Sequence, residues 1–176
     1  MNRENFAPNE WYHCYTRGVD KRETFTCPAD YQRFLEVLFL CNSKEPVHRS
    51  NFKKDIDIFS HNKADALVNI GVYCLMPNHF HLLIQETTGE GISSFMQKLG
   101  TSYTMYFNKR YDRIGNLFVK PFRSKHVSDD LYAKQVSAYI HINPVDLVYP
   151  NWSEDTHSFQ PQEVSDHIEN YQYSSF

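Results

Sequence analysis

Two histidines separated by one apolar residue, His79 and His81, are the residues of this chain best suited to chemistry. They close an apolar stretch over 68–84 whose composition predicts β-structure. Side chains two positions apart leave a strand on the same face, so the two imidazoles would project together while Phe80 and Leu82 fill the opposite face. Because imidazole is a common metal ligand, the pair predicts a metal site.

A second group lies on a predicted helix, where Gln135, Tyr139 and Asn143 fall four residues apart and share a face. If that helix crosses the face of His79 and His81, a phenol and an amide approach the two imidazoles. A tyrosine hydroxyl, with a pKa of about 10, is a weak nucleophile at neutral pH. A divalent cation on the two histidines and Asn143 would polarise a phosphoryl oxygen, and attack by Tyr139 would leave a covalent phosphotyrosine.

Each of these residues also has an ordinary structural interpretation. A histidine pair of this spacing is a weak metal motif when it stands alone. Tyr139 is one of 12 tyrosines, and most buried aromatic side chains serve packing. Asn143 precedes Pro144 and could simply end a helix. The combination of the three favours a site more than any one residue does.

The surrounding pattern predicts the elements that would position these groups. Ser128 is the expected N-cap of the last helix, which must stop near Pro144. The resulting order is β-α-β-β-α-β-α, which suits an α+β fold, an antiparallel sheet with helices packed on one face. The expected strands cover 11–16, 67–75, 79–86 and 125–127, and the first two helices cover 28–39 and 92–108.

Length and composition predict one folded domain over residues 1–176. The chain has 176 residues, 41% of them hydrophobic and 22% charged, which are globular proportions. We expect a polar insertion at about 42–66, to which the sequence assigns no function, and a C-terminal tail at about 151–176.

Charge and cysteine usage narrow the class of protein. The net charge of −3 argues against a general polyanion binder, although cations concentrate between positions 109 and 126. The four cysteines form no C-x-x-C pair, which predicts reduced thiols. No apolar window is long enough to span a membrane, and the first residues lack the apolar core of a secretory signal, so we expect a cytoplasmic protein with no membrane partner.

Taken together, the motifs resemble one family along nearly the whole chain. They are MPNHFHLL at 76–83, YIHINPV at 139–145, YH at 12–13 followed by RG at 17–18, GNLF at 115–118, FRS at 122–124 and YSSF at 173–176. In this order they are similar to the single-tyrosine HUH transposases of the insertion-sequence-200 type, and most of all to the REP-associated tyrosine transposases.

The resemblance implies a ferredoxin-like sheet and a metal-dependent enzyme that cuts and rejoins single-stranded DNA at hairpins or palindromic repeats. By that resemblance His79 and His81 are ligands of Mg²⁺ or Mn²⁺, Asn143 assists the metal, and Tyr139 is the nucleophile. DNA contacts would come from cations in the first loop and in the stretch 113–125, with stacking on groups such as Phe118. These cations are Arg17, Lys21, Arg22, Arg113, Lys120, Arg123 and Lys125.

Two other functions are compatible with the same residues. One is a domesticated module that binds hairpin DNA without transposing it, and the other is a metal-dependent hydrolase that uses water in place of Tyr139. The sequence also leaves open whether the protein is a monomer or a homodimer, and whether Tyr139 serves the histidines of its own chain or those of a partner.

Overall fold

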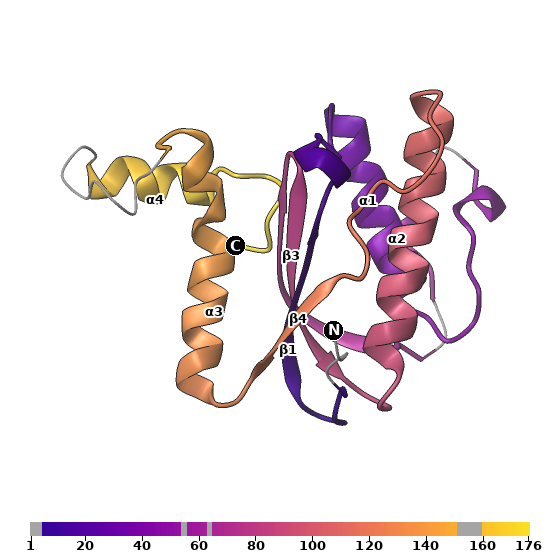
Figure 1. Ribbon diagram of the computed structural model, residues 1–176, viewed down its shortest axis with the longest axis horizontal. Coiled ribbons are helices and arrows are strands. Elements are labelled where there is room, and N and C mark those ends of the chain that lie inside the picture. Colours follow the sequence, from indigo (N-terminus) through magenta and orange to yellow (C-terminus); the bar gives the residue numbers. More distant parts are fainter. Residues whose placement is uncertain (1–4, 54–55, 63–64, 151–159) are drawn as a thin grey trace.

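The computed structural model describes residues 5–53, 56–62, 65–150 and 160–176. Four antiparallel strands form one sheet in the order β2-β3-β1-β4 (Figure 1). This order, reached through β-α-β-β-α-β connections, is that of a ferredoxin-like sheet, and the predicted α+β class is confirmed. The strands are β1 (Trp11–Arg17), β2 (Val68–Met76), β3 (His79–Glu86) and β4 (Arg123–Val127).

Helices α1 (Pro28–Cys41) and α2 (Gly91–Arg110) cover one face of the sheet (Figure 1). Their apolar stripes enclose the main core, in which Phe34 contacts Phe80 of β3 and Tyr103 of α2. The alternation along β3 therefore works as predicted, because its even-numbered apolar side chains point into this core and its histidines point away from it.

Helix α3 (Asp130–Ile142) lies against the opposite face of the sheet (Figure 1). Val136 and Ile140 of the helix pack with Leu83 and Val127 of the sheet in a second, smaller core. The expectation of helices on one face thus holds for α1 and α2, while α3 crosses the histidine face, as the proposed site requires.

The N-terminus of α3 differs from the prediction by one residue. Asp129, not Ser128, is the N-cap, and its carboxylate accepts the backbone N–H of Tyr132 at 2.8 Å. The Ser128 hydroxyl instead donates to the Asp129 carboxylate at 2.9 Å. An ionised acceptor satisfies the free N–H groups of a first turn better than a hydroxyl does, which explains the choice.

The C-terminus of α3 is as expected near Pro144. The α-helix ends at Ile142, and the chain continues as a 3₁₀ helix over Asn143–Leu147. Asn143 therefore sits at the junction of the two helices.

The junction between β3 and α2 is built around the buried carboxylate of Glu86. Burial alone would raise the pKa of this carboxyl, but the backbone N–H groups that it accepts outweigh burial and lower the pKa. A Cβ at Gly91 would stand 2.1 Å from the carbonyl oxygen of Leu67, so only glycine fits beside this carboxylate. The five N–H groups belong to Thr87, Thr88, Gly89, Gly91 and Ile92.

The polar segment at 42–66 carries two short 3₁₀ helices, Arg49–Asn51 and Ile58–Ser60, in its described part. Ile58 is buried, and the Asn42 side chain accepts the backbone N–H of Leu67 and donates to the carbonyl of Val68. These hydrogen bonds connect the start of the segment to the start of β2.

The C-terminal region contains α4 (Pro161–Glu169) and a short extended tail, while residues 151–159 of the predicted tail lie outside the described residues. The tail runs along the free edge of β2, where Leu75 N donates to Tyr173 O at 2.9 Å and Ser175 N donates to Tyr73 O at 3.0 Å. Tyr173 also stacks on Tyr31 of α1 with ring centroids 3.7 Å apart.

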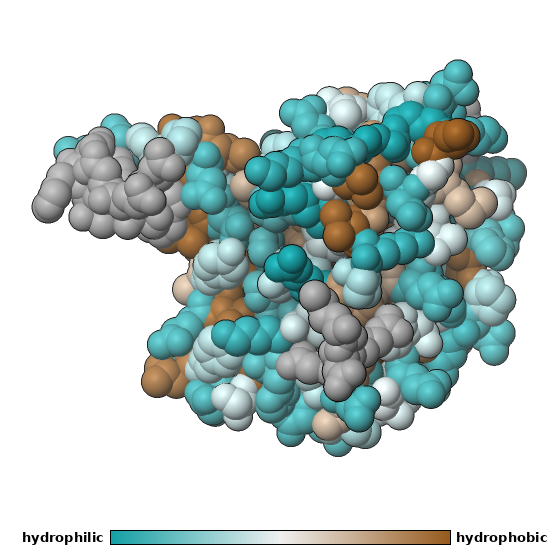
Figure 2. Space-filling view, viewed as in Figure 1, coloured by the Kyte–Doolittle hydropathy of each residue, from teal (hydrophilic) through white to brown (hydrophobic). Residues whose placement is uncertain are grey.

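All four cysteines are free thiols, in agreement with the prediction. Among the described residues, no helix combines the length and apolarity needed to cross a bilayer. Where α3 meets the sheet, the surface is mostly hydrophilic in the view of Figure 2.

Candidate active site

The register of β1 against β3 determines which side chains share the face covered by α3. Tyr15 is opposite His81 and Arg17 is opposite His79, so the odd-numbered residues of both strands project together. His13 lies on the same face, two residues before Tyr15 and opposite Leu83. The predicted pairing of His79 and His81 on one face is present, and β1 adds His13, Tyr15 and Arg17 to it.

The ring nitrogen atoms of the two predicted ligands are held by neighbouring side chains. His79 Nδ1 lies 2.6 Å from Asn78 Oδ1, and His81 Nδ1 lies 2.8 Å from Nε2 of His13. The rings of His79 and His81 are nearly perpendicular, with centroids 5.1 Å apart. Both contacts engage Nδ1, which leaves Nε2 of each ring as the atom for another ligand.

Helix α3 carries Tyr139 to the same place. Its ring centroid lies 5.6 Å from that of His81 and 5.9 Å from that of His13, edge-on in both cases. The side chain remains 53% exposed, so its hydroxyl can be reached from solvent. Tyr139 and the histidines come from one chain, so a single copy brings these groups together.

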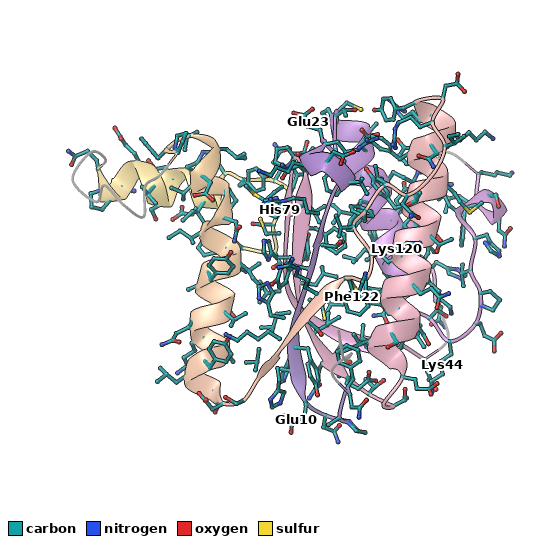
Figure 3. All side chains as sticks on the ribbon, in the orientation of Figure 1. Glu10, Glu23, Lys44, His79, Lys120 and Phe122 are labelled. Atoms are coloured by element: carbon teal, nitrogen blue, oxygen red, sulfur yellow. The ribbon has the colours of Figure 1, made fainter. Side chains whose placement is uncertain are left out.

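Asn143 lies one turn further along and is buried beside this tyrosine. Its Nδ2 donates to the carbonyl oxygen of Tyr139 at 2.7 Å, which leaves the amide oxygen as the acceptor. Gln135, which shares the predicted stripe, is exposed. Figure 3 shows His79 between the sheet and α3.

Burial keeps the histidines neutral. It lowers the pKa of His81 to about 3, with smaller contributions from the neighbouring His79, His13 and Arg17, and it lowers the pKa of His13 to about 4, together with Lys125. The pKa of His79 is lowered by burial and by Arg17, although Asn143 and Asp146 oppose the change. Neutral imidazole is the form that binds a metal.

The pKa of Tyr139 is raised, first by burial and then by the carboxylate of Asp146 and the Tyr15 phenol. The neighbouring Asn143 partly offsets this effect. The phenol is therefore protonated at neutral pH and needs nearby positive charge to act as a nucleophile.

The donor set suits a divalent cation. Two imidazole Nε2 atoms and one amide oxygen offer three ligands of types that accept Mn²⁺ and Mg²⁺, with further positions for water or phosphate oxygen atoms. Within the described ranges, no three or more His, Cys, Asp or Glu side chains are arranged to hold a metal ion.

The predicted DNA-contacting cations fall into separate groups. Arg123 is opposite Tyr15 and Lys125 is opposite His13 in the register of β4, so both share the histidine face with Arg17. All three are exposed.

Lys21 and Arg22 lie in the adjoining loop after β1, where the carbonyl of Lys21 accepts from the Asn78 amide at 3.2 Å. Arg22 makes local contacts with Val19 and Asp20. This pair therefore flanks the His79 end of the site.

The other cations lie elsewhere. Arg113 packs over Phe107 and donates to Asn108, both on α2. Lys120 lies on the α1 and α2 side of the sheet in the view of Figure 3. The expectation that Phe118 stacks on bases is wrong, because its ring is buried against Phe80 in the main core.

Sequence reasoning missed three residues near the site. His13 and Tyr15 occupy alternate positions of a predicted strand, but that signal becomes informative only when β1 is known to lie beside β3. Asp146 was missed because it follows the helix, in the 3₁₀ turn, although its charge acts on both His79 and Tyr139.

The fold and the site define an α+β domain whose sheet presents paired histidines to a tyrosine on a crossing helix. The family model "Transposase IS200 like" matches residues 31–143 of this chain. The chain therefore belongs to the IS200-like transposase family, as its motifs predicted.

One solved structure gives the same fold. A REP-associated tyrosine transposase bound to a REP hairpin is 15% identical and superposes with a TM-score of 0.66, covering 100% of this chain and 82% of that one. A putative transposase from Deinococcus radiodurans R1 is 16% identical, with a TM-score of 0.45, over 80% of this chain and 95% of that one. No curated protein matches the chain.

Proposed function

We propose that the protein is a metal-dependent endonuclease and strand transferase that acts on single-stranded DNA at hairpins through Tyr139. The observation that carries this proposal is the approach of two side chains from elements that are distant in the sequence. The centroids of the Tyr139 and His81 rings lie 5.6 Å apart. A hydrolase that used water would need no exposed tyrosine at this position. Hairpin DNA is the ligand of the similar REP-associated transposase, which supports the choice of substrate.

The reaction follows from the groups at the site. Tyr139 Oη attacks the phosphorus atom of a phosphodiester, the new Oη–P bond forms, and the bond from phosphorus to the 3′ oxygen breaks. The phenol proton is lost to solvent and the leaving oxygen gains one, so the products are a 5′-phosphotyrosine and a free 3′ hydroxyl. Attack of a 3′ hydroxyl on the phosphotyrosine reverses these steps and joins two strands.

A Mg²⁺ or Mn²⁺ ion, held by His79, His81 and Asn143, would supply the positive charge that polarises the phosphoryl oxygen. The protein's own residues supply the rest. Burial keeps the imidazoles neutral and ready to bind, and α3 presents the phenol at the edge of the same face. We assign no water nucleophile.

The cations on this face suit the DNA backbone. Arg17, Arg123 and Lys125 flank the histidines on β1 and β4, and Lys21 and Arg22 extend the positive charge along the adjoining loop. Phosphate contacts of this kind determine affinity and salt dependence, not sequence choice. Arg113 and Lys120 would contact DNA only if it also extended over the other side of the sheet.

The test is a denaturing gel of the protein incubated with labelled single-stranded hairpin DNA, with Mn²⁺ or Mg²⁺ and with chelator. We expect a metal-dependent covalent adduct that disappears in Tyr139→Phe, while DNA affinity changes by less than about threefold, since only one exposed hydroxyl is lost. Tyr149→Phe, which removes another tyrosine hydroxyl outside this face, is the matched control and should still form the adduct. His79→Ala should reduce cleavage and metal dependence together.

Two outcomes would contradict the proposal. Metal-dependent cleavage that persists in Tyr139→Phe and releases a free 5′-phosphate would indicate the hydrolase that uses water. Tight hairpin binding with no cleavage of any hairpin in a varied set would indicate the domesticated binding module.

A further inference from the structure

A third histidine, His13, contacts the site but takes no part in the reaction as derived above. It comes from the middle of β1, is 7% exposed, and lies outside the segment matched by the family model. Its Nε2 lies 2.8 Å from Nδ1 of His81, and the rings are stacked with centroids 5.0 Å apart. His13 therefore contacts His81 directly through Nε2, and it is placed to influence the protonation of the His81 ring.

The neighbouring His79 shows what such a contact does. Asn78 Oδ1 can only accept a hydrogen bond, so His79 Nδ1 must carry the proton across their 2.6 Å contact. The proton on Nδ1 leaves the lone pair of His79 on Nε2. Outer partners of this kind fix the tautomer and the ring orientation of metal-binding histidines.

The contact between His13 and His81 has two arrangements, and only one serves a metal. If His13 donates, the proton of His81 must sit on its Nε2, which blocks that nitrogen. If His81 donates from Nδ1, its Nε2 lone pair is free, and both strand histidines then offer the same ring atom on one face. Two neutral imidazoles can share one hydrogen bond in either direction, so the arrangement depends on what binds at Nε2.

We infer that His13 is a positioning residue that accepts the Nδ1 proton of His81 and so holds its Nε2 toward the divalent cation. The inference rests on the proposed function. Packing holds His13 in place, because its ring also lies against Tyr15, with centroids 5.0 Å apart. Its neighbour across the strand pair, Lys125, is a cation and does not compete as an acceptor.

The test compares two substitutions that keep a side chain of similar size. His13→Phe keeps a ring for stacking and removes the acceptor, whereas His13→Gln keeps a carbonyl oxygen close to the position of Nε2. We expect His13→Phe to weaken Mn²⁺ binding, measured by calorimetry on the DNA-free protein, by about 10- to 100-fold, the loss typical of outer partners. His13→Gln should remain within about threefold of wild type.

Two results would overturn the inference. One is Mn²⁺ binding by His13→Phe as tight as wild type, and the other is an equal loss in His13→Gln, which would indicate a packing role alone. If His79→Ala weakens Mn²⁺ binding but His13→Phe binds Mn²⁺ as tightly as wild type, only this inference fails. If wild type and His79→Ala give the same isotherm, the proposed function fails with it.

A second measurement uses the unsubstituted protein and does not depend on how the variants fold. The ¹⁵N shifts of the imidazole nitrogen atoms distinguish the two tautomers of His81 at pH 7.5. We expect the proton on Nδ1 in the presence of Zn²⁺, a diamagnetic probe, and a proton on Nε2 would overturn the inference.

Discussion

Acidification should destabilise the metal-free protein through its buried histidines. An unfolded histidine takes up a proton near pH 6.5, whereas burial and Lys125 lower the pKa of His13 in the folded protein to about 4. Between these values the unfolded state binds the additional proton, so stability is complete above about pH 6.5 and falls as the pH decreases. The folded state takes up the same proton only near pH 4, where the loss levels off.

The magnitude follows from these two pKa values. Between pH 7.5 and pH 5, His13 alone should reduce the free energy of unfolding by about 2 kcal/mol. The pKa of His81 is lowered in the same direction by burial, so its proton adds to the loss. With a urea dependence of about 2 kcal/mol per M, the His13 contribution corresponds to a midpoint lower by about 1 M.

Urea denaturation in the presence of chelator, at several pH values between 7.5 and 5, measures this loss. His13→Gln removes the titrating group and should flatten the pH dependence by about 2 kcal/mol. His48→Gln, on the 42–66 segment, controls for the removal of one histidine. If wild type and His13→Gln lose the same stability over this range, the burial argument is refuted.

Three further predictions follow from contacts described above. Glu86→Gln should lower the free energy of unfolding by about 3 kcal/mol, because an amide replaces a charged acceptor of five backbone N–H groups. Thermal or urea denaturation measures this loss, and an unchanged midpoint would contradict the prediction. Asn78→Ala should weaken Mn²⁺ binding by about 10-fold in calorimetry, since His79 loses the partner that fixes its proton, and wild-type affinity would count against this role. Arg123→Gln should reduce the slope of log affinity for hairpin DNA against log salt by about 1, whereas Arg113→Gln should keep the wild-type slope because Arg113 contacts Asn108 on α2. Equal slopes for wild type and both variants would argue against the histidine face as the DNA-binding surface.

The sequence predicted the elements and the central pair of the site because both depend on local periodicity. Alternation along 79–86 separates the histidines from the core side chains, and the spacing of Tyr139 and Asn143 places Asn143 one turn beyond Tyr139, just after the end of α3. These relations need no knowledge of which strands are neighbours.

The remainder of the site depends on pairings between distant segments. His13 meets His81 only because β1 enters the sheet beside β3, 68 residues away. The backbone of Phe118 pairs with Gly18, the residue after β1, and its ring is buried in the main core. Neither contact can be read from the residues next to Phe118 in the sequence. The cations between 109 and 126 are close in sequence but separate in space, because that stretch includes the end of α2, a loop and β4.

The C-terminal tail has a consequence for how copies of the protein meet. An outer strand with unpaired main-chain groups is a template on which another chain can add a strand, and this is a common route to aggregation. Here the N–H of Leu75 and the carbonyl of Tyr73 are already taken by residues 173 and 175 of the same chain. The stretch of the β2 edge around residues 73–75 is therefore protected from intermolecular strand addition.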